Sequence, residues 1–335
     1  MDRPLAKRLI ITPGEPAGIG AEILVEAAHH GASPLITIDD PERLKAAAAA
    51  SNRPLEIAAI NQVSEADHLP GETLAVLPVR WAEPPVAGQP SPANASQVID
   101  AIRTAAILAK DGKVKGIVTN PIQKSTLYAA GFKSPGHTEF LGELDGPQSQ
   151  PVMMLANSQL KVVPLTIHIP LKEVPAAITA DKIAATATVL DDSLRRDFGH
   201  DHPRIAVAGL NPHAGEDGTI GREDRDIIAP AIADLRRGGM NISGPFSADT
   251  LFHEDRRQDY DAVIAMYHDQ ALIPVKSLDF HGGVNITLGL SYIRTSPDHG
   301  TALDQAGKGT ANPQSLMAAI TMAETMAANR RGHHA

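Results

Sequence analysis

The chain contains no cysteine among its 335 residues. Disulfides, thiolate nucleophiles and cysteine zinc sites are therefore excluded, and any metal site must be built from His, Asp or Glu. Aromatic residues are scarce, at 3%, which argues against the stacking platforms that bind single-stranded nucleic acid. The formal net charge is -9 and no basic stretch stands out, so we expect no nucleic-acid partner.

Long apolar runs are also missing. The longest, such as AAITMAETMAA, are shorter than the roughly 20 residues that a helix needs to cross a bilayer. The N-terminal stretch MDRPLAKRLIITPG lacks the apolar run of a signal peptide. We therefore expect no membrane partner and a cytoplasmic location, which agrees with the lack of cysteine.

Short apolar runs alternate with longer segments of helical periodicity. The runs that read as strands are RLIITPG, PLITIDD, LEIAAI, TLAVLPV, VKGIVTN, QPVMMLA, LKVVPLTIHI, RIAVAGL, DAVIAMY and VNITLGL. Asn94 or Ser96 is a candidate cap for one helix and Thr179 for another. Such alternation predicts an α/β fold with a largely parallel sheet, and the length allows two domains.

The first strand runs into a glycine-rich turn, TPGEPAGIGAE, from Thr12 to Glu22. Its glycines do not have the G-x-G-x-x-G spacing of a dinucleotide fingerprint, and no G-K-[ST] follows for a P-loop. A tight strand-to-helix turn and a ligand loop of another fold both remain open.

His137 and Thr138 lie at a predicted helix start, in SPGHTEFLGEL. The free N–H groups and the positive dipole at a helix N-terminus attract anions, and both side chains add donors. A simple helix cap is the alternative, but Leu141 stands where a capping box has Glu or Gln. The pattern favours an anion-binding role.

Three histidines mark the ends of three different predicted strands: His168 and His268 end theirs, and His213 lies just past the third. Ligands of open α/β sheets gather beyond the carboxyl ends of strands, so the three imidazoles can converge on one divalent metal. Each alone is more typical of a structural histidine, and it is their common position that favours a metal. Asp249 and Asp269 are candidates for supporting the ligands or for moving a proton.

Lys276, Asn285 and Arg294 occur in the glycine-rich C-terminal region. A lysine and an arginine there suit a phosphate or a carboxylate, although each alone is compatible with a solvated charge. The turn-rich stretch TSPDHGTALDQAGKG, which follows Arg294, is a candidate lid or nucleotide loop.

Taken together, these motifs resemble the 4-hydroxythreonine-4-phosphate dehydrogenase family of pyridoxal phosphate biosynthesis. The resemblance rests on ITPGEPAGIG, GHTEF, GLNPHAGEDG, ADTLF, AMYHDQ, VNITLGL and RTSPDHGTA. It implies a fold like that of isocitrate and isopropylmalate dehydrogenases: two α/β/α domains with a cleft between them, paired as a homodimer with the active site at the interface. We place residues 1–128 and 276–335 in the first domain. Residues 129–275 form the second, which carries the metal ligands and dimer contacts.

The resemblance also implies an activity, the NAD- or NADP-dependent oxidation of 4-phosphooxy-L-threonine. The product, 2-amino-3-oxo-4-phosphobutanoate, decarboxylates to 3-amino-2-oxopropyl phosphate. One divalent metal (zinc, magnesium or cobalt) is expected on His168, His213 and His268. The expected substrate residues are His137, Thr138, Lys276, Asn285 and Arg294, with Asp249 and Asp269 as candidate bases. Two alternatives remain: a related dehydrogenase of threonate or erythronate 4-phosphate, and a metal-dependent hydrolase or phosphotransferase without NAD.

Overall fold

The computed structural model describes residues 8–32, 34–134 and 136–333, and the chain forms two compact units. Unit 1 comprises Met1–Pro151 and Leu290–Ala328, and unit 2 comprises Val152–Gly289 and Asn329–Ala335. These bounds differ from the division predicted at residues 128/129 and 275/276. The reason is packing: the helix that begins at His137 lies against a helix of unit 1, and the strand that ends at Leu288 pairs within unit 2.

Unit 1 contains one parallel sheet in the order β3-β4-β2-β1-β5-β12. Its strands are β1 (Leu9–Thr12), β2 (Leu35–Asp39), β3 (Ile57–Ala59), β4 (Leu74–Pro78), β5 (Ile117–Thr119) and β12 (Arg294–Pro297). Its helices are α1 (Gly20–His29), α2 (Pro41–Ala50), α3 (Ala95–Lys110), α4 (Lys124–Ala129), α5 (His137–Asp145) and most of α12 (Gln314–His333), with short turns η1 (Val63–His68) and η2 (Pro92–Asn94).

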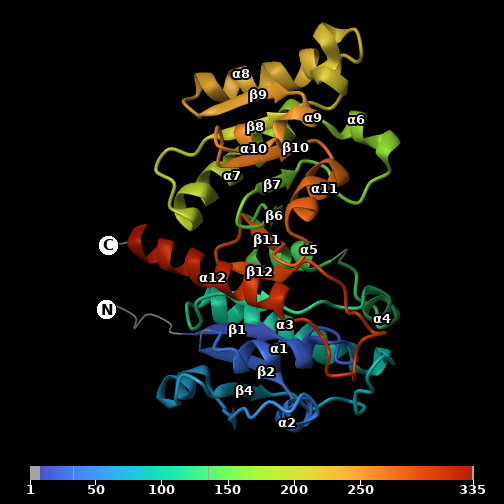
Figure 1. The fold of residues 1–335 in the computed structure, drawn as a ribbon, viewed down its shortest axis with the longest axis vertical. Coiled ribbons are helices and arrows are strands. Elements are labelled where there is room, and N and C mark those ends of the chain that lie inside the picture. The colour runs from blue at the N-terminus through green and yellow to red at the C-terminus, as the bar shows by residue number, and fades with distance from the viewer. Residues whose placement is uncertain (1–7, 33, 135, 334–335) are drawn as a thin grey trace. The chain divides into compact units, whose positions relative to one another are not determined.

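The chain runs outward from β1 to β2 and β4, then returns to the other side of β1 to form β5. Because parallel crossovers are right-handed, α1 and α3 lie on opposite faces of this sheet, and α3 packs against β1 and β5 (Figure 1). The reversal places a topological switch point between β1 and β5. Ligands of such sheets bind beyond the carboxyl ends of the strands at this point.

Unit 2 has a mixed sheet in the order β11-β6-β7-β10-β8-β9, in which β6 is antiparallel to both of its neighbours. Its strands are β6 (Val152–Ala156), β7 (Lys161–Pro164), β8 (Ile205–Ala208), β9 (Ile242–Phe246), β10 (Ala262–Ala265) and β11 (Val284–Leu288). Its helices are α6 (Val174–Ala177), α7 (Ala180–Phe198), α8 (Ala229–Arg237), α9 (Ala248–Leu251), α10 (Glu254–Arg257) and α11 (His268–Leu278), with η3 (Leu171–Glu173), η4 (Pro212–Gly218) and the π-helical turn η5 (Asp224–Ile228).

Each unit has its own apolar core. In unit 1, side chains of α3 such as Ile102 pack with Ile10 of β1 and Ile117 of β5. In unit 2, Val162 of β7 and Val263 of β10 pack with Val275 of α11. The predicted α/β class with a largely parallel sheet is confirmed, and every run predicted to be a strand contains one. Among the residues described, no helix is long and apolar enough to cross a membrane.

Candidate active site

The three histidines predicted to bind a metal all follow the carboxyl ends of neighbouring strands in unit 2. β7, β10 and β8 are adjacent and parallel, and His168, His213 and His268 come after β7, β8 and β10 in turn. His168 does not end its strand as predicted, because β7 stops at Pro164; likewise β10 stops at Ala265 and His268 begins α11. The histidines therefore lie on the connections that follow the carboxyl ends of these strands.

Hydrogen bonds join these three connections to one another. The Thr166 hydroxyl donates to the carbonyl of Met266 at 2.7 Å, which links the segment of His168 to that of His268. The Gln270 amide accepts from Met266 N at 2.7 Å and donates to the carbonyl of Gly209 at 2.8 Å. The segments that carry the histidines are therefore fixed to each other before any ligand binds.

His168 and His268 lie side by side, with 5.9 Å between their ring centroids. Nδ1 of His268 is 2.6 Å from Oδ1 of Asp269. A carboxylate on one ring nitrogen orients the imidazole and leaves Nε2 for a metal. Both histidines and Asp269 line a cavity of about 280 Å³.

His213 lies on an unusual stretch of backbone. The φ angles from His213 to Asp217 are all positive, between 44° and 81°, although only Gly215 is a glycine. His168 also has a positive φ, 49°. Left-handed backbone costs a non-glycine residue roughly 1–2 kcal/mol, and such strain is concentrated at functional sites.

The buried carboxylate of Asp224 holds the entrance of this loop. It accepts from the backbone N–H of Leu210 at 2.7 Å and of Asn211 at 3.1 Å, and from the Asn211 side chain at 2.8 Å. Asp224 begins η5, and single π-turns of this kind are frequent at functional sites. Asp224 was not predicted as a site residue, although it lies six residues after the motif GLNPHAGEDG.

Asp249 lies near His213. The hydrogen bond from Ser247 lowers the pKa of the Asp249 carboxyl, and the nearby His213 ring contributes in the same direction. Each of the two candidate bases is thus associated with a different histidine: Asp269 with His268, and Asp249 with His213.

The predicted ligands are only partly brought together. Among residues 8–32, 34–134 and 136–333, no group of three or more His, Asp or Glu side chains is arranged to hold a metal ion. The donor chemistry nevertheless fits a divalent metal, since imidazole nitrogen suits zinc and related ions. Within the described chain, His168 and His268 form a pair, and His213 does not join them.

Two predicted substrate residues also belong to unit 2. Lys276 lies on α11, two turns after His268, and its Nζ is 6.0 Å from the centroid of the Phe280 ring. Lys276, His268 and Asp269 line a second cavity of about 460 Å³. Asn285 lies on β11, opposite Leu155 of β6, and is partly buried.

The other predicted substrate residues belong to unit 1, where Arg294 is a buried cation. Arg294 begins β12, is 3% exposed and donates from Nη2 to the hydroxyl of Thr119 at 2.7 Å. Burial lowers the pKa of its guanidinium to about 10, so the side chain stays charged at neutral pH. The nearby Glu139 carboxylate compensates this buried charge only in part, and an anionic ligand would add to that compensation.

His137 begins α5, as predicted, with Gly136 as the N-cap and Thr138 as the second helical residue. Burial, and then the charges of Arg294 and Lys124, hold the pKa of His137 well below its usual value. The Nε2 atom of His137 is shut off from solvent, and no described group bonds to it. At neutral pH the ring is therefore a neutral hydrogen-bonding group beside two cations.

Lys124 was not predicted, and it extends this group. It begins α4 and is exposed. A Cβ placed on Gly136 would lie 3.6 Å from Lys124 Nζ, which puts the ammonium at the start of α5. Arg294, Lys124, His137 and Thr138 are called the cationic cluster below.

A cationic cluster in one α/β unit and histidines beyond the strand ends of another are features of an enzyme that acts on a small anionic substrate. The model of the family described as "Pyridoxal phosphate biosynthetic protein PdxA" matches residues 31–323. The chain belongs to this family, which confirms the resemblance drawn from the motifs.

Full-length relatives agree with the family match. A 4-hydroxythreonine-4-phosphate dehydrogenase of Caulobacter vibrioides is 49% identical over 98% of this chain and 98% of its own length. The enzyme of the same name from Roseobacter denitrificans is 49% identical over 97% of this chain and 98% of its own. The crystal structure of 4-hydroxythreonine-4-phosphate dehydrogenase from Klebsiella pneumoniae has a TM-score of 0.87 and 37% identity, and covers 96% of this chain and 100% of its own.

Proposed function

We propose that the chain is a NAD-dependent 4-hydroxythreonine-4-phosphate dehydrogenase in pyridoxal phosphate biosynthesis. The C3 hydroxyl of 4-phosphooxy-L-threonine loses its proton to a base and the C3 hydrogen leaves as hydride to the nicotinamide. The product is a β-keto acid, which loses CO₂ to give 3-amino-2-oxopropyl phosphate. The observation that carries this proposal is near-identity in length and 49% identity with an enzyme of that name.

In this proposal the cationic cluster binds the negatively charged group of the substrate. Arg294 meets a phosphate or carboxylate through parallel N–H donors, and Lys124 acts as a point charge. The neutral His137 and the Thr138 hydroxyl donate hydrogen bonds without further charge. Lys276 and Asn285 of unit 2 are further proposed substrate residues, and Lys276 shares a cavity with His268.

His168, His213 and His268 are the proposed ligands of one divalent metal, for which zinc, magnesium and cobalt are the candidates. When bound, such a metal acts as a Lewis acid that lowers the pKa of the substrate hydroxyl. Asp269 fixes the ring of His268 through Nδ1. Asp249 and Asp269 remain the proposed proton acceptors, since each carboxylate lies beside a proposed ligand.

A homodimer with the active site at its interface is part of the proposal. Four large apolar side chains of unit 2 are exposed on segments that carry or follow the histidines His168 and His268: Ile169, Leu171, Ile273 and Phe280. Exposed apolar side chains grouped in this way are typical of protein interfaces. A partner subunit packed on them would enclose the cavities of His168, His268 and Lys276. Sedimentation tests this, and a fully active monomer would contradict it.

The decisive experiment measures reduced nicotinamide during turnover, with and without added metal, on a panel of four-carbon phosphates. We expect metal-dependent reduction of NAD with 4-phosphooxy-L-threonine. A preference for threonate or erythronate 4-phosphate would identify a related dehydrogenase instead. Product without reduced nicotinamide would identify a hydrolase or phosphotransferase. The same assay with NADP decides between the two cofactors, and cell fractionation tests the predicted cytoplasmic location.

A further inference from the structure

Glu139 is a carboxylate beside the cationic cluster, and it is not among the proposed substrate residues. It lies in the first turn of α5, directly after His137 and Thr138, and is partly exposed. A Cβ placed on Gly136 would lie 3.3 Å from Glu139 Oε2 and 3.6 Å from Lys124 Nζ. The start of α5 is therefore lined by one negative and one positive side chain.

The charge of Glu139 also reaches Arg294. Burial lowers the pKa of the Arg294 guanidinium, and the nearby Tyr292 and Glu139 oppose that shift. Glu139 acts on Arg294 through its charge and not through a hydrogen bond. Because Arg294 and Lys124 are the two cations of the cluster, the carboxylate leaves one net positive charge. An anion that binds there is attracted by two groups and repelled by a third.

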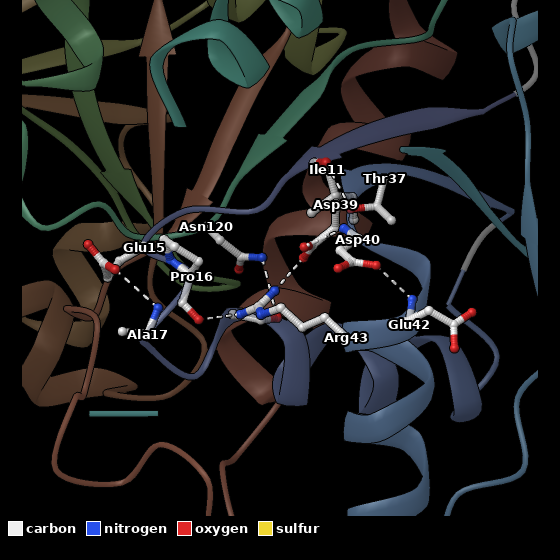
Figure 2. Close-up of polar contacts among 11 residues, drawn as sticks. Ile11, Glu15, Pro16, Ala17, Thr37, Asp39, Asp40, Glu42, Arg43 and Asn120 are labelled. Atoms are coloured by element: carbon white, nitrogen blue, oxygen red, sulfur yellow. Dashed lines mark hydrogen bonds and ion pairs between the residues drawn. The ribbon is translucent and has the colours of Figure 1, made fainter. Parts of the chain in front are cut away.

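Arg43 and Asp39 form a pair of another kind in the same unit. Arg43 donates to Asp39 Oδ2 at 2.5 Å and to the carbonyl of Pro16 at 2.6 Å (Figure 2). The guanidinium of Arg43 is thus bonded to acceptors of the protein itself, as expected for a structural pair. Glu139 instead lies near Arg294 without bonding to it. It lowers the positive potential of the cluster but does not act as the hydrogen-bond acceptor of the arginine.

The position of α5 relative to β12 is fixed by two hydrogen bonds. The Tyr292 hydroxyl donates to the carbonyl of Leu141 at 3.1 Å. Ser291 N donates to Asp145 Oδ2 at 2.8 Å. Both bonds join α5 to the residues just before β12. They hold α5, and with it Glu139, beside the arginine that begins β12.

The substrate and the product of the proposed reaction carry the same phosphate group. A cluster that holds this group tightly binds both of them more tightly, which lowers KM without raising kcat. Tight binding also delays the departure of the product, and product release limits the turnover of many enzymes. A carboxylate beside the two cations lowers the affinity for substrate and product alike.

We propose that Glu139 limits the affinity of the cationic cluster for the phosphate group and thereby favours the release of the phosphorylated product. The inference rests on the proposed function, in which the cluster binds the phosphate of the substrate. It gives the start of α5 two opposed side chains: Lys124 attracts the anion and Glu139 repels it.

The test is calorimetric titration of the full-length protein with inorganic phosphate, at mildly alkaline pH where phosphate is mainly a dianion. In Glu139→Gln the charge is lost, while glutamine at the third position of a helix can cap it as glutamate does. We expect phosphate to bind about fivefold more tightly, the effect of one partly exposed charge pair. The gain should shrink as salt is added. Methanesulfonate, a monoanion, should gain less, because the repulsion scales with the charge of the ligand.

Kinetics and two further variants complete the test. Glu139→Gln should have a lower KM for the phosphorylated substrate and be inhibited more strongly by inorganic phosphate. Its kcat should not rise, and a higher kcat would contradict the role in product release. Glu139→Asp keeps the charge and should bind phosphate as the unaltered protein does. The control is Glu42→Gln, an equal change of charge on an exposed side chain of α2, which should leave phosphate affinity unchanged.

Unchanged or weaker phosphate binding in Glu139→Gln, or an equal gain for methanesulfonate, would overturn the inference while leaving the dehydrogenase function intact. If neither the unaltered protein nor the variant bound phosphate, the assignment of the cluster to the substrate phosphate would fail together with the inference. The dehydrogenase function is decided separately, by the reduction of nicotinamide during turnover.

Discussion

In unit 2 the proposed metal ligands lie on connections that follow strands, and the backbone of two of them is left-handed. In unit 1 the proposed substrate residues lie at the start of a helix and on a buried strand. His168 and His213 have positive φ angles, and they present imidazole nitrogens. Arg294 is 3% exposed, and with Lys124 it presents fixed positive charge. The two units therefore suit different ligands: unit 2 suits a metal ion, which accepts lone pairs, and unit 1 suits an anion.

The energetic origin of the two arrangements also differs. In unit 2 the strain is in the backbone, and the carboxylate of Asp224 and the amide of Gln270 hold the connections that bear it. In unit 1 the residues of the cationic cluster lie on ordinary helix and strand backbone, and the unfavourable term is the burial of a cation. Binding a metal would offset the backbone strain in unit 2, and binding a phosphate would offset the buried charge in unit 1. Loss of a histidine and loss of the arginine should therefore affect different steps.

The largest effect is expected from His268→Ala. We expect turnover to be abolished and metal affinity to fall by more than the 10- to 100-fold that follows loss of a supporting residue. Metal content by mass spectrometry and turnover of NAD measure the two effects. The matched control is His202→Ala, an exposed histidine before the amino end of β8. If His268→Ala kept full metal content and activity, the three histidines of unit 2 would have another role.

The next largest effect is expected from Arg294→Ala. Charged hydrogen bonds contribute about 1.5–3 kcal/mol, so kcat/KM should fall roughly 10- to 150-fold. Metal content should change little, because the proposed metal ligands lie in unit 2. NAD affinity should change little, because Arg294 is proposed to hold the substrate anion. The variant should also discriminate less between the phosphorylated and the free substrate. Equal rates of the unaltered enzyme on both substrates would show that the cationic cluster does not serve the phosphate.

A smaller effect is expected from Lys124→Met. Because Lys124 is exposed, water and salt screen its charge, and we expect a loss of about 1 kcal/mol, or roughly fivefold in kcat/KM. The loss should shrink as salt is added. Lys133→Met, on the exposed connection between α4 and α5, is the control. An equal loss in both variants would assign the effect to general surface charge.

The elements found from the sequence are those with strong apolar runs. The strands β9 and β12 were missed for opposite reasons: β9 contains Gly244 and Pro245, which weaken a strand pattern, and β12 is short and polar although it is buried. Thr179 was predicted as a helix cap, and its hydroxyl does accept from Lys182 N.

The parts of the site that sequence could not provide depend on tertiary contacts. Lys124 stands in a stretch without a motif, and it becomes relevant only because α4 brings it beside Gly136. Thr119 is one more buried strand residue until Arg294 bonds to it. Asp224 acts through backbone N–H groups thirteen and fourteen residues earlier in the chain. The positive φ angles at His168 and His213 have no signature in side-chain type, since neither residue is a glycine.

The smallest expected effect is on how the free energy of unfolding depends on pH. His137 has a pKa held well below 6.5 by burial and by the charges of Arg294 and Lys124. As the pH falls through 6.5, the unfolded chain binds a proton at this ring that the folded chain does not bind, so the free energy of unfolding decreases. His137→Asn removes this contribution while keeping a hydrogen-bonding side chain of similar reach. Its stability, measured by urea unfolding between pH 7 and about pH 5, should therefore decline less steeply than that of the unaltered protein. The control His29→Asn, on an exposed ring of α1, should follow the unaltered curve. Identical slopes for all three proteins would mean that His137 titrates in the folded state as it does in the unfolded chain. The cationic cluster would then hold a third positive charge at acid pH, and His137 would not be the neutral hydrogen-bonding group that its burial indicates.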